Sequence, residues 1–378
     1  MAAAGILRAV HVESIDLQAP SASDLARWRE LAARAIEPNP FFEPEYVLPL
    51  ARGLGQQAQV QLLVARDGDE WQACLPVHSP KGWHGIPLRS LSTWRGHVLY
   101  GLLGTPLVAA DRAEESLSAL LDGMRRAEPH ARFAGFDWVA DDRAMSEPLA
   151  GALDGLSPTP IPFDRFERAA LCRRPEPTYL EETLSSKHRR ELRRQRRKLG
   201  EALGAEPEMV ERAGEDAAYE RFIALEGAGR KGDRGVVISA DPGHVAFFKE
   251  MCREFAELGR LQLLELHGAG QVVATKCNLL AGDTIFCVKI AYDEKWSAYS
   301  PGILLESEMV EHFHDESSAD FMDSCADPNN QMINRLWPDR RPMTIHAIPA
   351  DALAGRATRS ALAAARFARD RKRDRRNT

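Results

Sequence analysis

The chain has 378 residues, of which 44% are hydrophobic and 28% charged, with a formal net charge of −6. This composition is that of an ordinary globular protein, and a chain of this length is expected to form two domains. No apolar run approaches the roughly 20 residues of a membrane span, and the N-terminus is too short and too weakly apolar for a signal peptide, so we expect a cytoplasmic protein.

Charge and cysteine usage narrow the class of protein further. Two segments are strongly basic, from Lys187 to Lys198 and from Arg356 to Arg376, so the remainder is acidic. The six cysteines show no CxxC pair and no zinc-type spacing, which predicts free thiols and no metal site. Cys277 and Cys287 lie on neighbouring predicted strands and could face each other, although a cytosolic disulfide is rare.

The first half of the chain alternates helices and strands. Ser23 is expected to cap the first helix, and Arg66-Asp-Gly-Asp to close a hairpin. The predicted elements are helices at 23–36, 43–54, 112–127 and 142–153, hairpin strands at 59–65 and 71–77, a long loop at 80–96, and strands at 97–103 and 132–139.

The second half follows a passage over residues 157–174 and repeats much of this order. A basic helix is expected at 179–203, with a break near Ser185-Ser186. The other predicted elements are strand 208–212, helices 214–227 and 242–258, strands 260–267, 271–280 and 284–291, helix 303–314, a strand ending at Asp323, strand 342–348 and helix 350–370.

Both halves therefore predict helix, helix, hairpin, strand, helix and strand. This pattern indicates an α/β fold (an α+β arrangement with mixed sheets) built from two related units. The expected division is 1–165 for the first unit, 166–350 for the second, and 351–378 for a basic C-terminal helix and tail.

The most informative segment is the turn at residues 292–302. There, a predicted strand is followed by a Gly-containing turn and then by the start of a helix. Free N–H groups and the helix dipole at a helix start favour an anion. Lys295 could pair with a phosphate as a point charge. Lys289 interrupts the apolar strand before the turn, so it faces a cleft or lies at the sheet edge.

Several motifs together resemble the FemAB/CelD-like branch of the GNAT acyltransferase superfamily, a group of bacterial tandem-GNAT proteins. The motifs are Asn39-Pro-Phe-Phe-Glu-Pro-Glu-Tyr, Gly104-Thr-Pro-Leu-Val, Arg230-Lys-Gly-Asp-Arg-Gly, Ala291-Tyr-Asp-Glu and Tyr299-Ser-Pro-Gly-Ile-Leu-Leu-Glu. The resemblance covers most of residues 38–348. Arg230 stands where the family has Trp, and the family's Tyr-Lys is missing between Asp323 and Trp337, which leaves the substrate open.

The resemblance implies a tandem GNAT-like fold with acetyl-CoA or another acyl-CoA as cosubstrate and no metal. The second unit would carry the cosubstrate, and the first unit would shape the acceptor side. The implied cofactor-binding residues are Lys289, Ile290, Ala291, Lys295, Ser300, Gly302 and Ile303. The implied substrate-binding residues are Arg230, Lys231 and Gly232.

Acyl transfer from a thioester needs an amine held close, a group that accepts its proton and a donor to the leaving thiolate. The catalytic candidates are Asp323, Glu226, His97 and Tyr292. Asp323 has a second interpretation, in which it pairs with a buried donor such as one from the segment between Arg335 and Arg341. No nucleophile elbow and no metal-ligand spacing is present.

The leading hypothesis is an acyl-CoA-dependent N-acyltransferase that works by direct attack on a small or carrier-bound amine. A first alternative is a FemAB-type transferase that depends on aminoacyl-tRNA, with the basic helix from Lys187 to Lys198 docking RNA or another anionic surface. A second alternative is a non-catalytic tandem-GNAT scaffold. The sequence does not distinguish acceptor identity, acyl chain length or oligomeric state.

Overall fold

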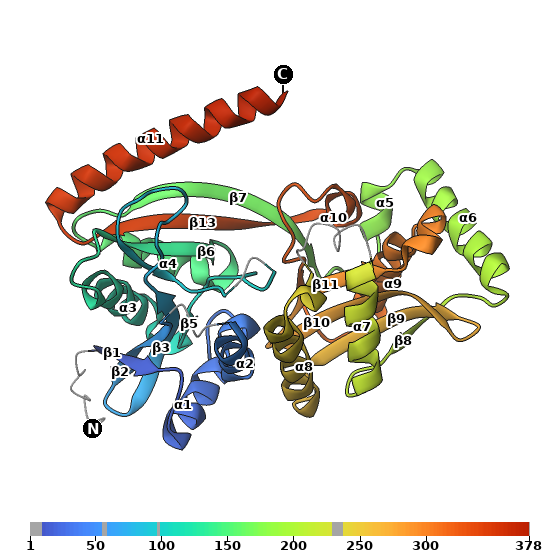
Figure 1. Cartoon of the computed structure of the whole chain (residues 1–378), viewed down its shortest axis with the longest axis horizontal. Coiled ribbons are helices and arrows are strands. Elements are labelled where there is room, and N and C mark those ends of the chain that lie inside the picture. The colour runs from blue at the N-terminus through green and yellow to red at the C-terminus, as the bar shows by residue number, and fades with distance from the viewer. Residues whose placement is uncertain (1–9, 55–58, 97–98, 229–236, 378) are drawn as a thin grey trace.

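A single mixed sheet of 13 strands runs through the whole molecule, with helices packed on both faces (Figure 1). The structure is a computed structural model that describes residues 10–54, 59–96, 99–228 and 237–377, with side chains to residue 365. The strand order is β1-β2-β3-β4-β6-β13-β7-β12-β11-β10-β9-β8, with β5 paired to β3. None of the described helices is long and apolar enough to cross a membrane.

The first half of the chain builds one end of the sheet. Its elements are β1 His11–Asp16, α1 Ala22–Ala33, η1 Pro40–Phe42, α2 Pro44–Leu54, β2 Gln61–Asp67, β3 Glu70–His78, β4 Ser90–Thr93, β5 Leu107–Val108, α3 Ala113–Ala127, β6 Phe133–Ala140, α4 Ser146–Asp154 and β7 Ile161–Cys172.

The second half builds the other end. Its elements are α5 Tyr179–Thr183, α6 Ser186–Leu203, β8 Glu208–Glu211, α7 Asp216–Ala228, α8 Pro242–Glu257, β9 Leu261–Gly268, β10 Gln271–Ala281, β11 Thr284–Tyr292, η6 Glu294–Tyr299, α9 Pro301–Asp315, β12 Phe321–Asp323, α10 Gln331–Leu336, β13 Asp339–Pro349 and α11 Ala352–Asn377.

The two halves share one topology and exchange their last strands. In each half a parallel pair, β4 with β6 and β11 with β12, follows an antiparallel meander. The last strand of the first half, β7, pairs with β12, and the last strand of the second half, β13, pairs with β6. The predicted α/β tandem architecture is therefore confirmed. The expected division at residues 165 and 350 stays a prediction.

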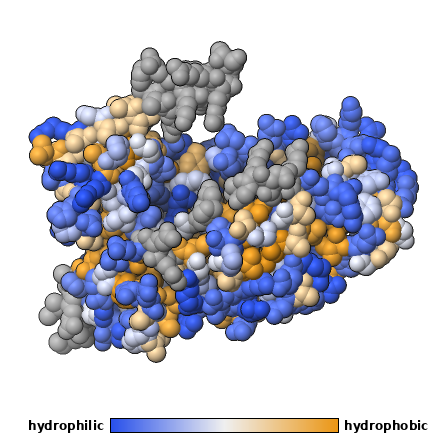
Figure 2. Space-filling view, in the orientation of Figure 1, coloured by the Kyte–Doolittle hydropathy of each residue, from blue (hydrophilic) through white to orange (hydrophobic). Residues whose placement is uncertain are grey.

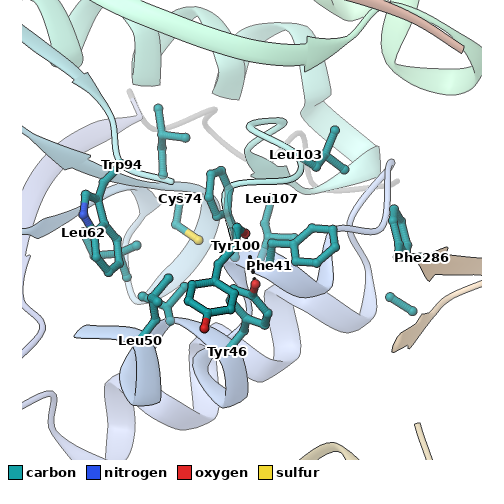
Figure 3. Close-up of a cluster of buried hydrophobic side chains, with 14 of the residues drawn as sticks. Phe41, Tyr46, Leu50, Leu62, Cys74, Trp94, Tyr100, Leu103, Leu107 and Phe286 are labelled. Carbon is teal, nitrogen blue, oxygen red and sulfur yellow. Dashed lines mark hydrogen bonds between the residues drawn. The ribbon is translucent and has the colours of Figure 1, made fainter. Parts of the chain in front are cut away.

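The hydrophobic core is continuous across the junction of the halves. Phe41 from the first half lies edge-on to Phe286 from β11, with ring centroids 5.7 Å apart. The Tyr46 hydroxyl donates to the Tyr100 carbonyl oxygen at 3.0 Å (Figure 3). The equivalent helices α2 and α8 cross at Gly53 and Gly243, where a Cβ on either residue would lie within 2.8 Å of the other's carbonyl oxygen. Glycine is needed there because the backbones touch.

Capping residues in the sequence predicted most helix ends to within a few residues. Ser185 accepts from the His188 N–H and starts α6, and Gly204 ends it in the left-handed region at φ 79°, so the predicted break is confirmed. The N-cap of α1 is Ser21 rather than Ser23, because Ser21 and Asp24 form a reciprocal capping box.

Three predictions in chain regions with few local signals are wrong. Residues 99–103 form a turn and irregular loop instead of a strand, and residues 97–98 lie outside the described residues. The expected loop at 80–96 contains strand β4, and the expected passage at 157–174 contains the long strand β7. Both missed strands owe their pairing to partners distant in the sequence.

The thiols remain free, as predicted, and all except Cys172 are buried. Cys277 and Cys287 do not face each other. The register places Lys289 opposite Cys277 and Asn278 opposite Cys287. The two thiols therefore belong to different hydrophobic clusters, on opposite faces of the sheet.

Candidate active site

Strand β11 opens away from its neighbour in its second half. Residues 284–286 pair with β12, whereas residues 287–292 have no strand partner on that side among the described residues. On its other side, β11 pairs with β10, and the register of this pairing shifts at the same place. Asn278 lies opposite Cys287 and Cys277 opposite Lys289, so Val288 has no partner on β10. This is a β-bulge, a feature that bends a strand and redirects its side chains. The result is a free strand edge at the C-terminal end of β11.

Helix α9 begins beside this edge. Its N-cap, Ser300, lies in the left-handed region at φ 55° and gives no side-chain cap, and the first turn contains no acidic residue. Pro301 has no N–H, while the N–H groups of Ile303 and Leu304 donate to the Ser300 carbonyl oxygen. The Gly302 N–H donates to no described atom, and together with the positive end of the helix dipole it favours an anion at this point.

The predicted cofactor-binding residues are brought together around this point. A Cβ on Gly302 would lie 3.3 Å from the Tyr292 ring, so the end of β11 touches the start of α9. Ile290 packs against the cluster beneath α9, and Ala291 is buried. Lys295 lies in η6 with 58% of its side chain exposed and pairs with Asp293 at 2.9 Å.

The charged residue inside β11 faces the opposite side of the sheet. Lys289 lies against α7, where its Nζ is 3.0 Å from Oε1 of Glu226. Glu226 is 4% exposed, and its Oε2 accepts from the Ile238 N–H at 2.8 Å. Two residues that the sequence placed in separate roles thus form one buried ion pair at the opened end of β11. His97 and the substrate-binding candidates Arg230, Lys231 and Gly232 lie outside the described residues.

Asp323 occupies a different environment from the one expected of a proton acceptor. It is fully buried, and Oδ2 accepts from Arg168 at 2.5 Å and from Arg341 at 2.7 Å. Burial alone would raise the pKa of Asp323, but the two guanidinium groups hold it below its ordinary value. A carboxylate held in this way is a weak base, so the geometry favours the ion-pair interpretation.

The equivalent opening in the first half is filled by the chain itself. Beyond its pairing with β4, strand β6 receives the loop after residue 99, since the Gly104 N–H donates to the Trp138 carbonyl oxygen at 2.8 Å and the Ala140 N–H to Thr105 Oγ1 at 2.9 Å. The first turn of α3 carries Glu114 and Glu115, which disfavour an anion. Only the second half combines an open edge with an uncharged helix start within the described residues.

Two residues near these groups, Tyr100 and Arg168, were not identified from the sequence. Tyr100 comes from the first half, and burial together with the negative charges of Glu226 and Asp241 raises the pKa of its hydroxyl. Arg168 and the Asp323 partner Arg341 lie directly opposite each other on β7 and β13. A charge inside an apolar strand pattern was the available signal for Arg168, whereas no local signal pointed to Tyr100.

The basic helix α6 packs against η6, next to the start of α9. Its apolar side, formed by Leu192, Leu199 and Leu203, joins the cluster beneath α9. Arg196 pairs with Glu308, whereas Lys187 and Arg193 form no ion pair with the described residues. This end of the molecule is coloured hydrophilic over much of the face seen in Figure 2.

Comparisons with known proteins identify a family domain and a shared fold. Residues 186–327 match the family model of the acetyltransferase (GNAT) domain. The chain is similar to a solved structure of FemX (11% identity, TM-score 0.53, covering 89% of this chain and 97% of that one). It is also similar to a conserved protein of unknown function from Bacteroides thetaiotaomicron (12% identity, TM-score 0.54, covering 89% of this chain and 100% of that one). A third similar structure is L-PGS from Bacillus licheniformis (14% identity, TM-score 0.51, covering 88% of this chain and 92% of that one).

At these identities the solved structures support the fold alone. Comparison with curated proteins gives no match. The matched domain contains α6, the meander β9–β11, the start of α9 and Asp323, which are the elements that carry the described geometry. Residues 186–327 therefore match an acetyltransferase (GNAT) domain, and the chain as a whole shares its fold with the structures of FemX and L-PGS.

Proposed function

We propose that the protein transfers an acyl group from acyl-CoA to an amine by direct attack, with no covalent enzyme intermediate. The observation that carries this proposal is the meeting of a free β11 edge with an uncapped α9 start. An extended amide chain such as pantetheine can add to a free strand edge through main-chain hydrogen bonds. A pyrophosphate suits the Gly302 N–H and the positive end of the helix dipole.

The proposed roles follow from position. The main chain of Lys289, Ile290 and Ala291 would hold the pantetheine arm. Ser300, Gly302 and Ile303 would hold the pyrophosphate, with Lys295 as an exposed cation beside it. The donor thus lies along the second half of the chain, between the opened end of β11 and helix α9.

The reaction needs one bond to form and one to break. The amine nitrogen attacks the thioester carbonyl carbon, the C–N bond forms, and the C–S bond breaks to release CoA thiolate. Glu226 is the proposed acceptor of the amine proton, directly or through water, and Tyr292 the proposed donor to the thiolate. Asp323 is a poor candidate for this base, because Arg168 and Arg341 both pair with its Oδ2.

Thermal unfolding with a series of acyl-CoAs tests the proposal. A ligand at a hundredfold its dissociation constant should stabilise the folded state by about 2.7 kcal/mol. We expect a rise in Tm with at least one acyl-CoA and none with inorganic phosphate at the same concentration. No rise with any chain length would argue against an acyl-CoA donor.

A second candidate is transfer from aminoacyl-tRNA. It is favoured by the unpaired cations of α6, which lie beside the turn that leads into α9. Binding of tRNA that weakens steeply with salt, together with no stabilisation by acyl-CoAs, would select it. Binding of neither donor, together with a tight protein partner, would select a scaffold instead.

A further inference from the structure

We infer that Lys289 is a positioning residue for Glu226. Its ammonium group is the charge partner of this buried carboxylate at the opened end of β11. The inference rests on the proposed function and adds a requirement to it. The added requirement is that Glu226, the proposed proton acceptor, needs the Lys289 cation, which the bulge in β11 directs toward it.

The bulge decides which way Lys289 points. Cys287 packs in the cluster beneath α9, and Val288 packs in the cluster that contains Phe222 of α7. In a regular strand, alternation would return residue 289 to the α9 side. Because Val288 is the unmatched residue, Lys289 stays on the α7 side and reaches Glu226.

The surroundings of Glu226 make this cation important. The carboxylate is 4% exposed, and the Lys289 side chain is 11% exposed. The neutral donor on Glu226 is the Ile238 N–H. The charges of Glu226 and Asp241 both act on the Tyr100 hydroxyl of the first half and raise its pKa. The His244 ring of α8 lies 5.4 Å from the Tyr100 ring. Among the described residues, Lys289 is the one cation within ion-pair distance of Glu226.

The consequence concerns proton transfer. A buried carboxylate without a cation favours its neutral form. A neutral carboxylic acid cannot take the proton of the attacking amine, so turnover on the acidic side of the pH profile would fall. Raising the pH would restore the ionised form and the rate. A purely structural contact would not produce this pattern.

The test is the pH profile of acetyl-CoA turnover in four variants. Lys289→Met, and Lys289→Gln as a polar substitute if the first folds poorly, should move the acidic limb upward by about one pH unit or more. Below the limb, turnover should fall about tenfold for each pH unit that the limb moves, and it should recover at higher pH. In Lys289→Arg the acidic limb should lie at its wild-type pH, because this substitution keeps the positive charge.

Lys276→Met is the matched control. Lys276 lies on the neighbouring strand β10 and forms another buried pair, with Nζ 2.7 Å from Oε2 of Glu306. Its loss should reduce stability and leave the acidic limb in place. If the wild type binds and turns over acetyl-CoA but the acidic limb of Lys289→Gln lies at the wild-type pH, this inference alone is overturned. Absence of acetyl-CoA binding by the wild type would overturn the proposed function and the inference together.

Discussion

Asp323→Asn is expected to lower the free energy of unfolding by about 3–5 kcal/mol, because it breaks a fully buried ion pair from one side. Arg168 and Arg341 lie directly opposite each other on neighbouring strands, and both side chains have no exposed surface. Like charges placed this way repel unless an anion lies between them. Arg341 keeps Glu37 and Asp142 as partners, whereas Arg168 has no other acidic partner among the described residues.

Chemical denaturation measures this effect, with Asp320→Asn as the control. Asp320 is 66% exposed and lies 3.6 Å from Arg173, so its substitution should change stability by less than about 0.5 kcal/mol. Because the pKa of Asp323 is lowered in the folded state, its stabilisation is present above the unfolded value of about 3.9 and is lost as the pH falls through the folded value. Unchanged stability with turnover reduced a hundredfold would instead return Asp323 to the base role.

Glu226→Gln is expected to lower kcat by about 10²-fold or more, the usual contribution of one positioned proton acceptor. The amide keeps the size of the side chain, and its oxygen can still accept from the Ile238 N–H. Acetyl-CoA affinity should therefore stay within a few-fold. The change removes the charge and the basicity that the reaction needs.

Steady-state kinetics, with Glu220→Gln as the control, check this expectation. Glu220 lies on the same helix, is 63% exposed and pairs with Lys249 at the surface, so its loss should leave kcat unchanged. Wild-type kcat in Glu226→Gln would remove Glu226 from the mechanism. A loss of kcat that follows only a loss of folded protein, measured by unfolding in parallel, would assign Glu226 to structure.

The sequence predicted elements whose signals are local. The meander β9–β11 has turn residues between apolar runs, and α6 and α9 begin at Ser185 and at a Ser-Pro-Gly turn. Strand β7 was missed because its first half is rich in charges, and its regular structure comes from pairing with β13 and β12 on either side. Tertiary pairing of this kind leaves little trace in the local pattern.

For the site, too, the sequence predicted the parts that depend on local signals and missed those that depend on tertiary pairing. The turn, Gly302 and the end of β11 follow from local chemistry, and the structure brings them together. The Lys289–Glu226 pair depends on a bulge, and a shift of register by one residue cannot be read from apolar spacing. The surroundings of Asp323 depend on two exchanged strands, so the sequence left both interpretations open.

Calorimetric titration of acetyl-CoA into the wild type and Gly302→Val tests the central claim most directly. A Cβ at position 302 already meets the Tyr292 ring at 3.3 Å, so the larger side chain would occupy the approach to the Gly302 N–H. Hydrogen bonds to charged groups contribute about 1.5–3 kcal/mol, so we expect affinity to fall about tenfold to a hundredfold, with less effect for Gly302→Ala and normal circular dichroism in both. Equal affinity of the wild type and Gly302→Val, with both folded, would contradict a donor site at the start of α9.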